Sequence, residues 1–211
     1  SSATTKWGHI SNWDVSKVTD MSNLFKDKTD FNDDISSWKV SNVIHMEYMF
    51  YGATAFNCGN SSDMNAWIVS KVTNMEGMFE DATAFNKDIS NWNTLVVEYQ
   101  HFMFENATSF NCGSSKNLIG PEINWQNSNL KVGGINNMFE NATSFNCPIF
   151  LNITNTLLLI NVFNGATDFN QDISSWDVSK VIQTTGIFDG TNELSACNKK
   201  LIYDSWESKK N

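Results

Sequence analysis

The chain of 211 residues is 41% hydrophobic and 13% aromatic, which supplies enough apolar surface for a substantial core and excludes a wholly disordered protein. Its formal net charge is -9 and all of its basic residues are lysines, so it lacks the basic footprint that nucleic-acid binding needs. The longest apolar run, 157–163, is much shorter than the roughly 20 residues that cross a bilayer, and no membrane span is predicted. Because the chain begins without Met and shows no signal peptide, we expect it to be a processed or trimmed product.

From residue 7 onward the chain is built of repeated units. The phrase MFENATSFNC stands at 103–112 and again at 138–147. Alignment on the Phe of this phrase gives an interval of about 25 residues, with insertions in the third and fifth units. The aligned residues are Phe25, Phe50, Phe79, Phe104, Phe139, Phe163 and Phe188. A steady interval of this kind is typical of units that stack on one another.

The second unit shows two hydrophobic periods joined together. Trp38 and Val40 alternate with polar neighbours, as residues of a strand do. From Val43 to Phe56 the apolar step is three or four residues, which suits a short α- or 3₁₀-helical stretch with one buried face. Each unit is therefore predicted to form one short parallel strand and one short helix. The fold class is α/β, a leucine-rich-repeat-like right-handed solenoid.

Trp recurs at the strand position, and we expect these rings to be core rather than a sugar-binding surface. The equivalents of Trp38 are Trp13, Trp67, Trp92 and Trp176, with Trp125 after an insertion and Leu151 in the sixth unit. The last segment, 195–208, has Leu201, Ile202 and Trp206 at helical spacing and predicts an amphipathic C-terminal cap. We predict a single solenoid domain over 1–211, with repeats over about 7–194.

Two polar columns accompany the repeat. An Asn follows the second Phe of six units, and a buried amide needs partners, so stacked units predict an asparagine ladder; six independent exposed turn residues are the alternative. These residues are Asn32, Asn57, Asn86, Asn111, Asn146 and Asn170. A Thr column favours turn or cap hydrogen bonds, and a hydroxyl array that binds ice is the other interpretation. Its members are Thr29, Thr54, Thr83, Thr108, Thr143 and Thr167.

The segments FNDDISSWKVSNVIHMEYMF at 31–50 and FNQDISSWDVSKV at 169–181 resemble the repeat of the BspA-like leucine-rich-repeat surface proteins. The closer match is a variant of roughly 25 residues, abundant in mycoplasma surface lipoproteins and of unknown function. The resemblance covers nearly the whole chain, and units five and six depart from it. It implies extracellular display with adhesion or scaffold duty and no assigned reaction. Related arrays in algae and large viruses leave a wall, scale or capsid-associated role open.

Contact with another protein or a glycan is the leading functional hypothesis, and outward strand positions are expected to provide it. These candidate partner-binding residues are Asn12, Asp14, Lys39, Ile68, Asn91, Asn93, Ser175 and Asp177. The insertions at 58–63 and 113–124 would project as loops, where specificity often lies. A structural subunit of a virion, cell covering or larger complex is the alternative, and ice binding through the Thr column is a minor one.

No pattern predicts catalysis, a cofactor or a metal site, and the chain is expected to be non-enzymatic. The histidines lack zinc-ligand spacing; they are His9, His45 and His101. An acidic patch lacks the spacing of an EF-hand and is interpreted as a solvated face; it comprises Asp27, Asp30, Asp33 and Asp34. No serine elbow, P-loop or dinucleotide fingerprint occurs in the sequence.

The cysteines and the glycosylation sequons favour an extracellular, cell-surface or virion-associated location. Cys112 and Cys147 follow the ladder Asn in successive units, where equivalent Cα atoms lie about 5 Å apart, so we predict a disulfide in an oxidising compartment. Small buried thiols are the alternative. The sequons that could accept a glycan begin at Asn60, Asn106, Asn141 and Asn152.

Overall fold

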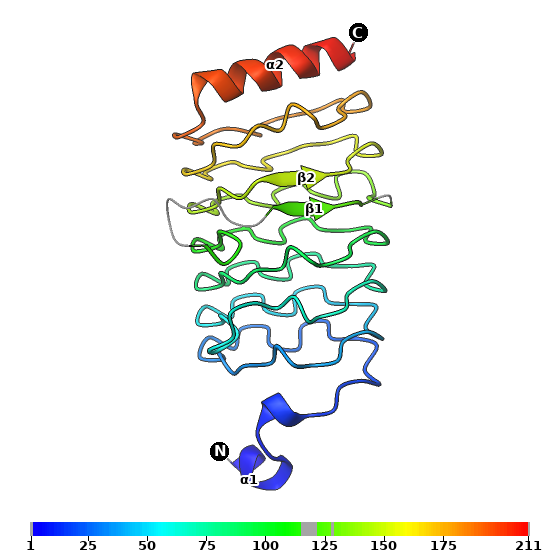
Figure 1. The fold of residues 1–211 in the computed structure, drawn as a ribbon, viewed down its shortest axis with the longest axis vertical. Coiled ribbons are helices and arrows are strands. Elements are labelled where there is room, and N and C mark those ends of the chain that lie inside the picture. The colour runs from blue at the N-terminus through cyan, green and yellow to red at the C-terminus, as the bar shows by residue number, and fades with distance from the viewer. Residues whose placement is uncertain (1, 115–121, 128, 211) are drawn as a thin grey trace.

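Successive stretches of the chain lie one above another, from the N-terminal to the C-terminal end, in the computed structural model (Figure 1). The structure describes residues 2–114, 122–127 and 129–210. We call these stretches layers 1 to 7, each containing one of the aligned Phe residues, from Phe25 in layer 1 to Phe188 in layer 7. Within the described ranges, helix is confined to the two ends. α1 (Ser2–Trp7) and the 3₁₀ helix η1 (Ile10–Asn12) precede layer 1, and α2 (Ala196–Lys210) follows layer 7.

Regular strand is scarce, so the prediction of one strand in every unit is wrong. β1 (Ile123–Trp125) and β2 (Ile149–Leu151) form a two-stranded parallel sheet in which Ile123 pairs with Ile149. Elsewhere in the described residues, strand-type pairing is limited to isolated parallel bridges. In layer 2 the Trp segment lies between two tight turns, closed by Trp38 N–H to Ile35 C=O at 3.0 Å and by Val43 N–H to Val40 C=O at 2.9 Å. These turns leave too few extended residues for a ladder.

The predicted helix is also absent from the described part of every layer, because half of the N–H groups bond to another layer. Phe50 and Gly52 donate to the carbonyls of Met78 and Glu80 in layer 3, each at 2.9 Å. Ala53 instead donates to Phe50, three residues back in its own layer, at 3.0 Å. A helix would direct all of these bonds within the segment. The segment is therefore a run of linked turns, and the three-to-four apolar step reflects turn geometry.

This alternation places two left-handed residues, four positions apart, in the turn segment of each layer. In layer 2 they are Tyr48 (φ 55°) and Gly52 (φ 65°). The layers contribute the pairs Asn23 and Asp27, Tyr48 and Gly52, Gly77 and Asp81, Phe102 and Asn106, Asn137 and Asn141, Asn161 and Gly165, and Gly186 and Gly190. Gly, Asn and Asp tolerate this conformation best, which explains their recurrence. Tyr48 is followed at the same position in layer 3 by Gly77, where a Cβ would overlap the Tyr48 ring.

Two columns of Phe rings form the centre of the core. One contains Phe25, Phe50, Phe79, Phe104, Phe139, Phe163 and Phe188, and the other contains Phe31, Phe56, Phe85, Phe110, Phe145 and Phe169. Ring centroids are 5.5 Å apart between Phe50 and Phe79 in adjacent layers, and 3.8 Å apart between Phe50 and Phe56 within a layer. Burial of each such ring stabilises the fold by roughly 2–3 kcal/mol, so the two columns make a large favourable contribution.

Most of the Trp column is core, as expected. Trp38 and Trp67 are 4% and 2% exposed. Each indole N–H donates to a carbonyl of the preceding segment, Trp38 to Ile10 at 3.0 Å and Trp67 to Ile35 at 3.1 Å. Trp13 is the exception at 41% exposed, because no earlier layer covers it.

The Asn column forms a ladder of side chain to backbone hydrogen bonds. The Asn32 Oδ1 accepts from the Asn57 N–H at 2.8 Å, and the Asn57 Oδ1 accepts from the Asn86 N–H at 2.9 Å. The Asn86 Oδ1 accepts twice, from Asn111 at 2.9 Å and from Gly113 at 2.8 Å. The series continues to Asn146 and Asn170. Each amide therefore satisfies a backbone donor that layer stacking removes from water.

α2 covers part of layer 7, and Ser195 and Asn198 continue the polar column beyond Asn170. The Asn170 Oδ1 accepts from the Ser195 N–H at 3.1 Å, and the Asn198 amide donates to the Asn170 carbonyl at 2.9 Å. Trp206 stacks over Phe188 with ring centroids 6.1 Å apart, continuing the aromatic column. The predicted C-terminal helix is confirmed.

The predicted disulfide is also confirmed. Cys112 and Cys147 are bonded, with Cα atoms 6.3 Å apart, and they join layers 4 and 5 beside the Asn ladder. Cys58 has the same repeat position in layer 2 and is a buried free thiol, whose pKa burial raises to about 11. Cys197 is an exposed free thiol on α2.

Removing one ladder amide tests the role of the column. Asn86→Ala leaves two backbone N–H groups without their acceptor, and we expect it to lower the free energy of unfolding by about 2 kcal/mol. Asn60→Ala, at an exposed position outside the ladder, is the matched control and should change it little. Urea denaturation followed by Trp fluorescence measures both. Equal stability of the two variants would contradict the role assigned to the ladder.

Candidate interaction surface

The predicted partner-binding residues flank the buried Trp column on its outward side, which we call the outward face. Asn12, Asn91 and Ser175 directly precede a Trp, and the others directly follow the Trp position. All eight are exposed: Asn12, Asp14, Lys39, Ile68, Asn91, Asn93, Ser175 and Asp177. Ile68 is 61% exposed, which is high for a branched aliphatic side chain. Their accessibility makes contact with a partner feasible and leaves their function a proposal.

Three of these residues also have a local structural task that the sequence analysis missed. The side chains of Asp14, Asn93 and Asp177 each accept a hydrogen bond from the N–H two residues on, at 3.0, 3.1 and 3.0 Å. A hydrogen bond from the side chain of the serine two residues further along is the main reason that the pKa of Asp14 and of Asp177 is lowered. This is an Asx-turn, which holds the corner after the Trp segment. The D-x-S pattern at 14–16 and 177–179 is the signal for it.

Lys39 and Ile68 occupy the same repeat position and cannot make that turn. A lysine side chain has no acceptor and an isoleucine side chain has no polar atom. Because neither is needed to close the corner, their exposed side chains are available for contact. They are therefore the strongest candidates on the outward face.

At the N-terminal end the outward face meets a group of hollows around Trp13. One cavity of about 570 Å³ is lined by Trp7, Asn12, Trp13 and Asp14, together with Val15 and Val18. A smaller one of about 330 Å³ extends from Trp13 to Lys39. Trp7 is 64% exposed, so two indoles lie open beside polar side chains. We call this region the Trp13 cleft.

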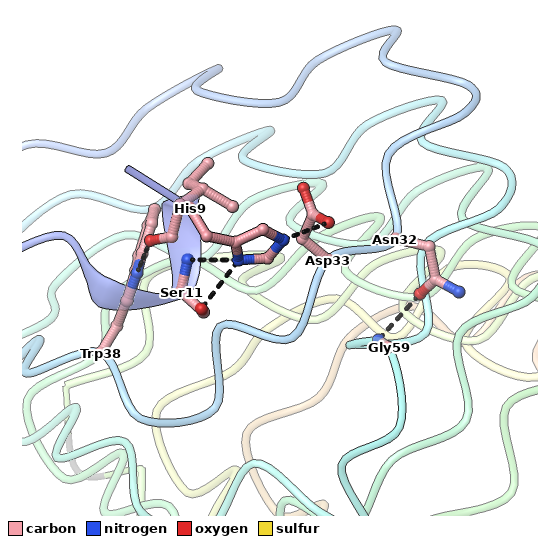
Figure 2. Close-up of polar contacts among 7 residues, drawn as sticks. His9, Ser11, Asn32, Asp33, Trp38 and Gly59 are labelled. Atoms are coloured by element: carbon pink, nitrogen blue, oxygen red, sulfur yellow. Dashed lines mark hydrogen bonds and ion pairs between the residues drawn. The ribbon is translucent and has the colours of Figure 1, made fainter. Parts of the chain in front are cut away.

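The segment that carries Trp13 is fixed to layers 1 and 2 by a small polar network. Figure 2 shows His9 between Ser11 and Asp33. The Ser11 N–H donates to His9 Nδ1 at 3.3 Å, and His9 Nε2 lies 3.4 Å from an Asp33 carboxylate oxygen. The nearby Trp38 indole bond to the Ile10 carbonyl anchors η1. Within 2–114, 122–127 and 129–210, no three His, Cys, Asp or Glu side chains are grouped to hold a metal ion.

A different surface carries a column of glutamates. Glu80, Glu105 and Glu140 occupy equivalent positions in layers 3 to 5 and are partly buried. Burial and the charge of Glu105 raise the pKa of Glu80 to about 7, and burial and the charge of Glu140 raise that of Glu105 to about 7. The close stacking that serves the core thus places like charges next to each other.

Two predicted features were glycosylation sites and projecting loops. Asn60 and Asn141 are exposed, whereas Asn106 and Asn152 are partly buried. The amide nitrogen of Asn141 donates to Asn106 Oδ1 at 3.0 Å, so the atom that would carry a glycan is engaged.

Of the insertions, 58–63 lies against layer 1 through the Gly59 N–H, which donates to Asn32 Oδ1 at 3.0 Å (Figure 2). Most of 113–124 lies outside the described residues.

The Thr column provides hydrogen bonds between layers. The hydroxyls of Thr54 and Thr83 donate to the carbonyl of the Thr in the preceding layer, at 3.4 and 3.3 Å. The same bond recurs at Thr108, Thr143 and Thr167. The geometry thus accounts for the column as a structural feature.

The family described as "Mycoplasma protein of unknown function, DUF285" matches residues 1–62, 60–120 and 114–210. The chain belongs to this family. Neither the curated proteins nor the solved structures contain a significant match to it. The DUF285 matches overlap at 60–62 and 114–120, within the two insertions of the repeat. In the described part of this DUF285 chain, no helix is long and apolar enough to cross a membrane.

The glutamate column predicts a stability that rises on mild acidification. The folded pKa of about 7 exceeds the ordinary value of 4.5, so between these values the folded chain holds protons that the unfolded chain releases. Stability should therefore increase as the pH falls through 7 and level off near 4.5. The lowered pKa of Asp14, Asp20, Asp34 and Asp177 acts in the opposite sense only near or below 3.8.

Thermal unfolding measured from about pH 8 to about pH 5 checks this expectation. The double variant Glu80→Gln and Glu105→Gln should unfold at a higher temperature than the parent at the upper pH and should show a flatter pH profile. Glu193→Gln, an exposed carboxylate outside the column, should retain the profile of the parent. A parent that loses stability as the pH falls over this range would contradict the role assigned to the glutamate column.

Proposed function

We propose that this DUF285 chain is a non-enzymatic recognition module of an extracellular, cell-surface or virion-associated protein. Its architecture is proposed to be a single right-handed, leucine-rich-repeat-like solenoid over 1–211. The disulfide between Cys112 and Cys147 supports an oxidising location, because such bonds persist mainly outside the reducing cytosol. The stacked layers support the proposed architecture. Repeat arrays commonly use an extended surface to bind partners, which supports the proposed role.

One observation carries the binding proposal: Trp13 is 41% exposed in a chain whose other equivalent Trp rings, at 38, 67, 92, 125 and 176, are at most 4% exposed. Its indole lines the cavities of about 570 and 330 Å³ that meet the outward face. Exposed aromatic rings next to convergent polar groups are typical of ligand sites. Asn12, Asp14 and Lys39 supply those polar groups.

The chemistry of the Trp13 cleft fits a glycan well. An indole face packs against the apolar face of a sugar ring, and amide, carboxylate and ammonium groups bond its hydroxyls. The adjoining Lys39 and Ile68 extend the contact onto the outward face and would suit a glycosylated protein. A structural subunit of a virion, cell covering or larger complex is the second candidate. It is favoured by backbone groups of layers 1 and 7 that have no partner among the described residues.

Variants on the outward face test the recognition proposal. Immobilised oligosaccharides and glycoproteins are used as probes in surface plasmon resonance with the full chain. We expect Trp13→Ala and Lys39→Glu each to weaken binding by about tenfold or more, because anchor residues dominate binding energy. Lys180→Glu is the charge-matched control from the opposite end of the stack and should bind as the parent does.

A second matched pair separates glycan from protein recognition. Ile68→Asp should weaken binding to a glycoprotein more than to its free oligosaccharide, whereas Ile182→Asp, 77% exposed near the C-terminal end, should leave both unchanged. Absence of saturable binding to every probe would overturn the recognition proposal. So would a loss of binding in the controls Lys180→Glu and Ile182→Asp equal to that of the outward-face variants. Circular dichroism of each variant confirms that the fold is retained.

A further inference from the structure

The layers are joined by backbone hydrogen bonds of both polarities. Beside the turn segments, N–H groups donate to the preceding layer, as Ile44 does to Thr19 at 2.7 Å and Ala55 to Thr29 at 3.1 Å. In the turn segments, N–H groups at every second residue donate to carbonyls of the following layer. Phe25 donates to Met49 at 2.8 Å, and Phe163 donates to Ile187 at 3.1 Å. The same pattern joins the intervening layers. In its turn segment, each layer thus presents donors towards the C-terminal end and acceptors towards the N-terminal end.

Both rows end without partners. In layer 7 the N–H groups of the row have no acceptor among the described residues; this donor row consists of Thr184, Gly186, Phe188 and Gly190. In layer 1 the corresponding carbonyls have no donor among the described residues; this acceptor row consists of Asp20, Ser22, Leu24 and Lys26. Unpaired main-chain groups at an edge are a template for another chain.

The C-terminal cap leaves part of the donor row uncovered. A cavity of about 620 Å³ separates α2 from layer 7, lined by Thr184, Ile187 and Phe188 below and by Tyr203 and Trp206 above, with Lys199, Ile202 and Glu207. Tyr203 is 63% exposed at this groove. The Trp206 indole is only 8% exposed, and its N–H has no acceptor among the described residues.

The N-terminal end has a matching opening beside the acceptor row. A cavity of about 760 Å³ lies there, lined by Leu24, Phe25 and Phe31 of layer 1 and by the segment at 8–10. Leu24 is 46% exposed. The acidic side chains of Asp27, Asp30 and Asp33 outnumber the one lysine, Lys28, among its lining residues, and Lys199 lies in the C-terminal groove.

We propose that the groove between α2 and layer 7 binds the layer 1 end of a second copy of this chain. The donor row of one copy pairs with the acceptor row of the next along the open edge of the groove, beside the Trp206 ring that covers Phe188. Leu24 of the incoming copy packs against Tyr203, and the aspartates approach Lys199. The contact joins unlike surfaces, so it is heterologous and each copy keeps one end open for a further copy.

This inference does not rest on the proposed glycan or protein recognition, because it uses the ends of the stack and not the outward face. Its test uses sedimentation velocity of the full chain over a wide concentration range. The parent should form dimers and longer species with increasing concentration. Leu24→Glu and Tyr203→Glu, both at exposed positions, should each weaken association by about tenfold or more.

An equimolar mixture of the two variants gives the decisive result. Leu24→Glu retains an intact C-terminal groove, and Tyr203→Glu retains an intact layer 1 end, so the mixture should form mixed dimers and nothing longer. Ile68→Glu, also at an exposed apolar position but on the outward face, should associate as the parent does. A parent that is monomeric at all concentrations would overturn the proposal. So would a mixture without mixed dimers, or an Ile68→Glu variant that fails to associate.

Discussion

The backbone hydrogen bonds between layers are the constraint on which the rest of the structure depends. Because alternate N–H groups leave their own layer, the chain cannot form helices there and adopts linked turns with two left-handed residues. The same bonds hold equivalent residues one layer apart, so Phe stacks on Phe at 5.5 Å between Phe50 and Phe79. Each residue therefore packs against the equivalent residue of the next layer, so the same residue type recurs at that position. The recurrence of MFENATSFNC follows from this constraint.

The sequence was sufficient to predict the stacked arrangement of its units, the Phe and Trp core, the C-terminal helix and the disulfide. It was misleading for the secondary structure within a unit. Apolar residues three or four apart describe one face of a helix, and they also describe linked turns that each close over three residues. The informative signal was the Gly, Asn or Asp at two positions of each layer, as in Asn137 and Asn141. Tyr48 and Phe102 at such positions obscure it, because large side chains seldom adopt positive φ.

The candidate site was predictable in outline only. Alternation along the Trp segment identifies the exposed positions, but it does not separate Asp14, which closes a turn, from Lys39, which does not. The exposure of Trp13 could not be inferred from its local sequence at all. WDVSKV stands at 13–18 and at 176–181, yet Trp13 is 41% exposed and Trp176 is 0% exposed. What differs is the number of neighbouring layers, which is a property of position in the stack.

The polarity of the turn-segment rows also makes the two ends of the stack chemically different. The turn segment of layer 7 presents backbone donors and that of layer 1 presents backbone acceptors, whatever the side chains are. Two like rows brought together would oppose donors to donors or carbonyls to carbonyls, so a twofold dimer through these rows gains no main-chain bonds. Only unlike rows are complementary, and repeated contacts of that kind produce rings or filaments. The outward face has no such polarity, because its exposed groups are side chains. Recognition along the face and association through the ends therefore impose separate demands on the sequence, and one chain can satisfy both.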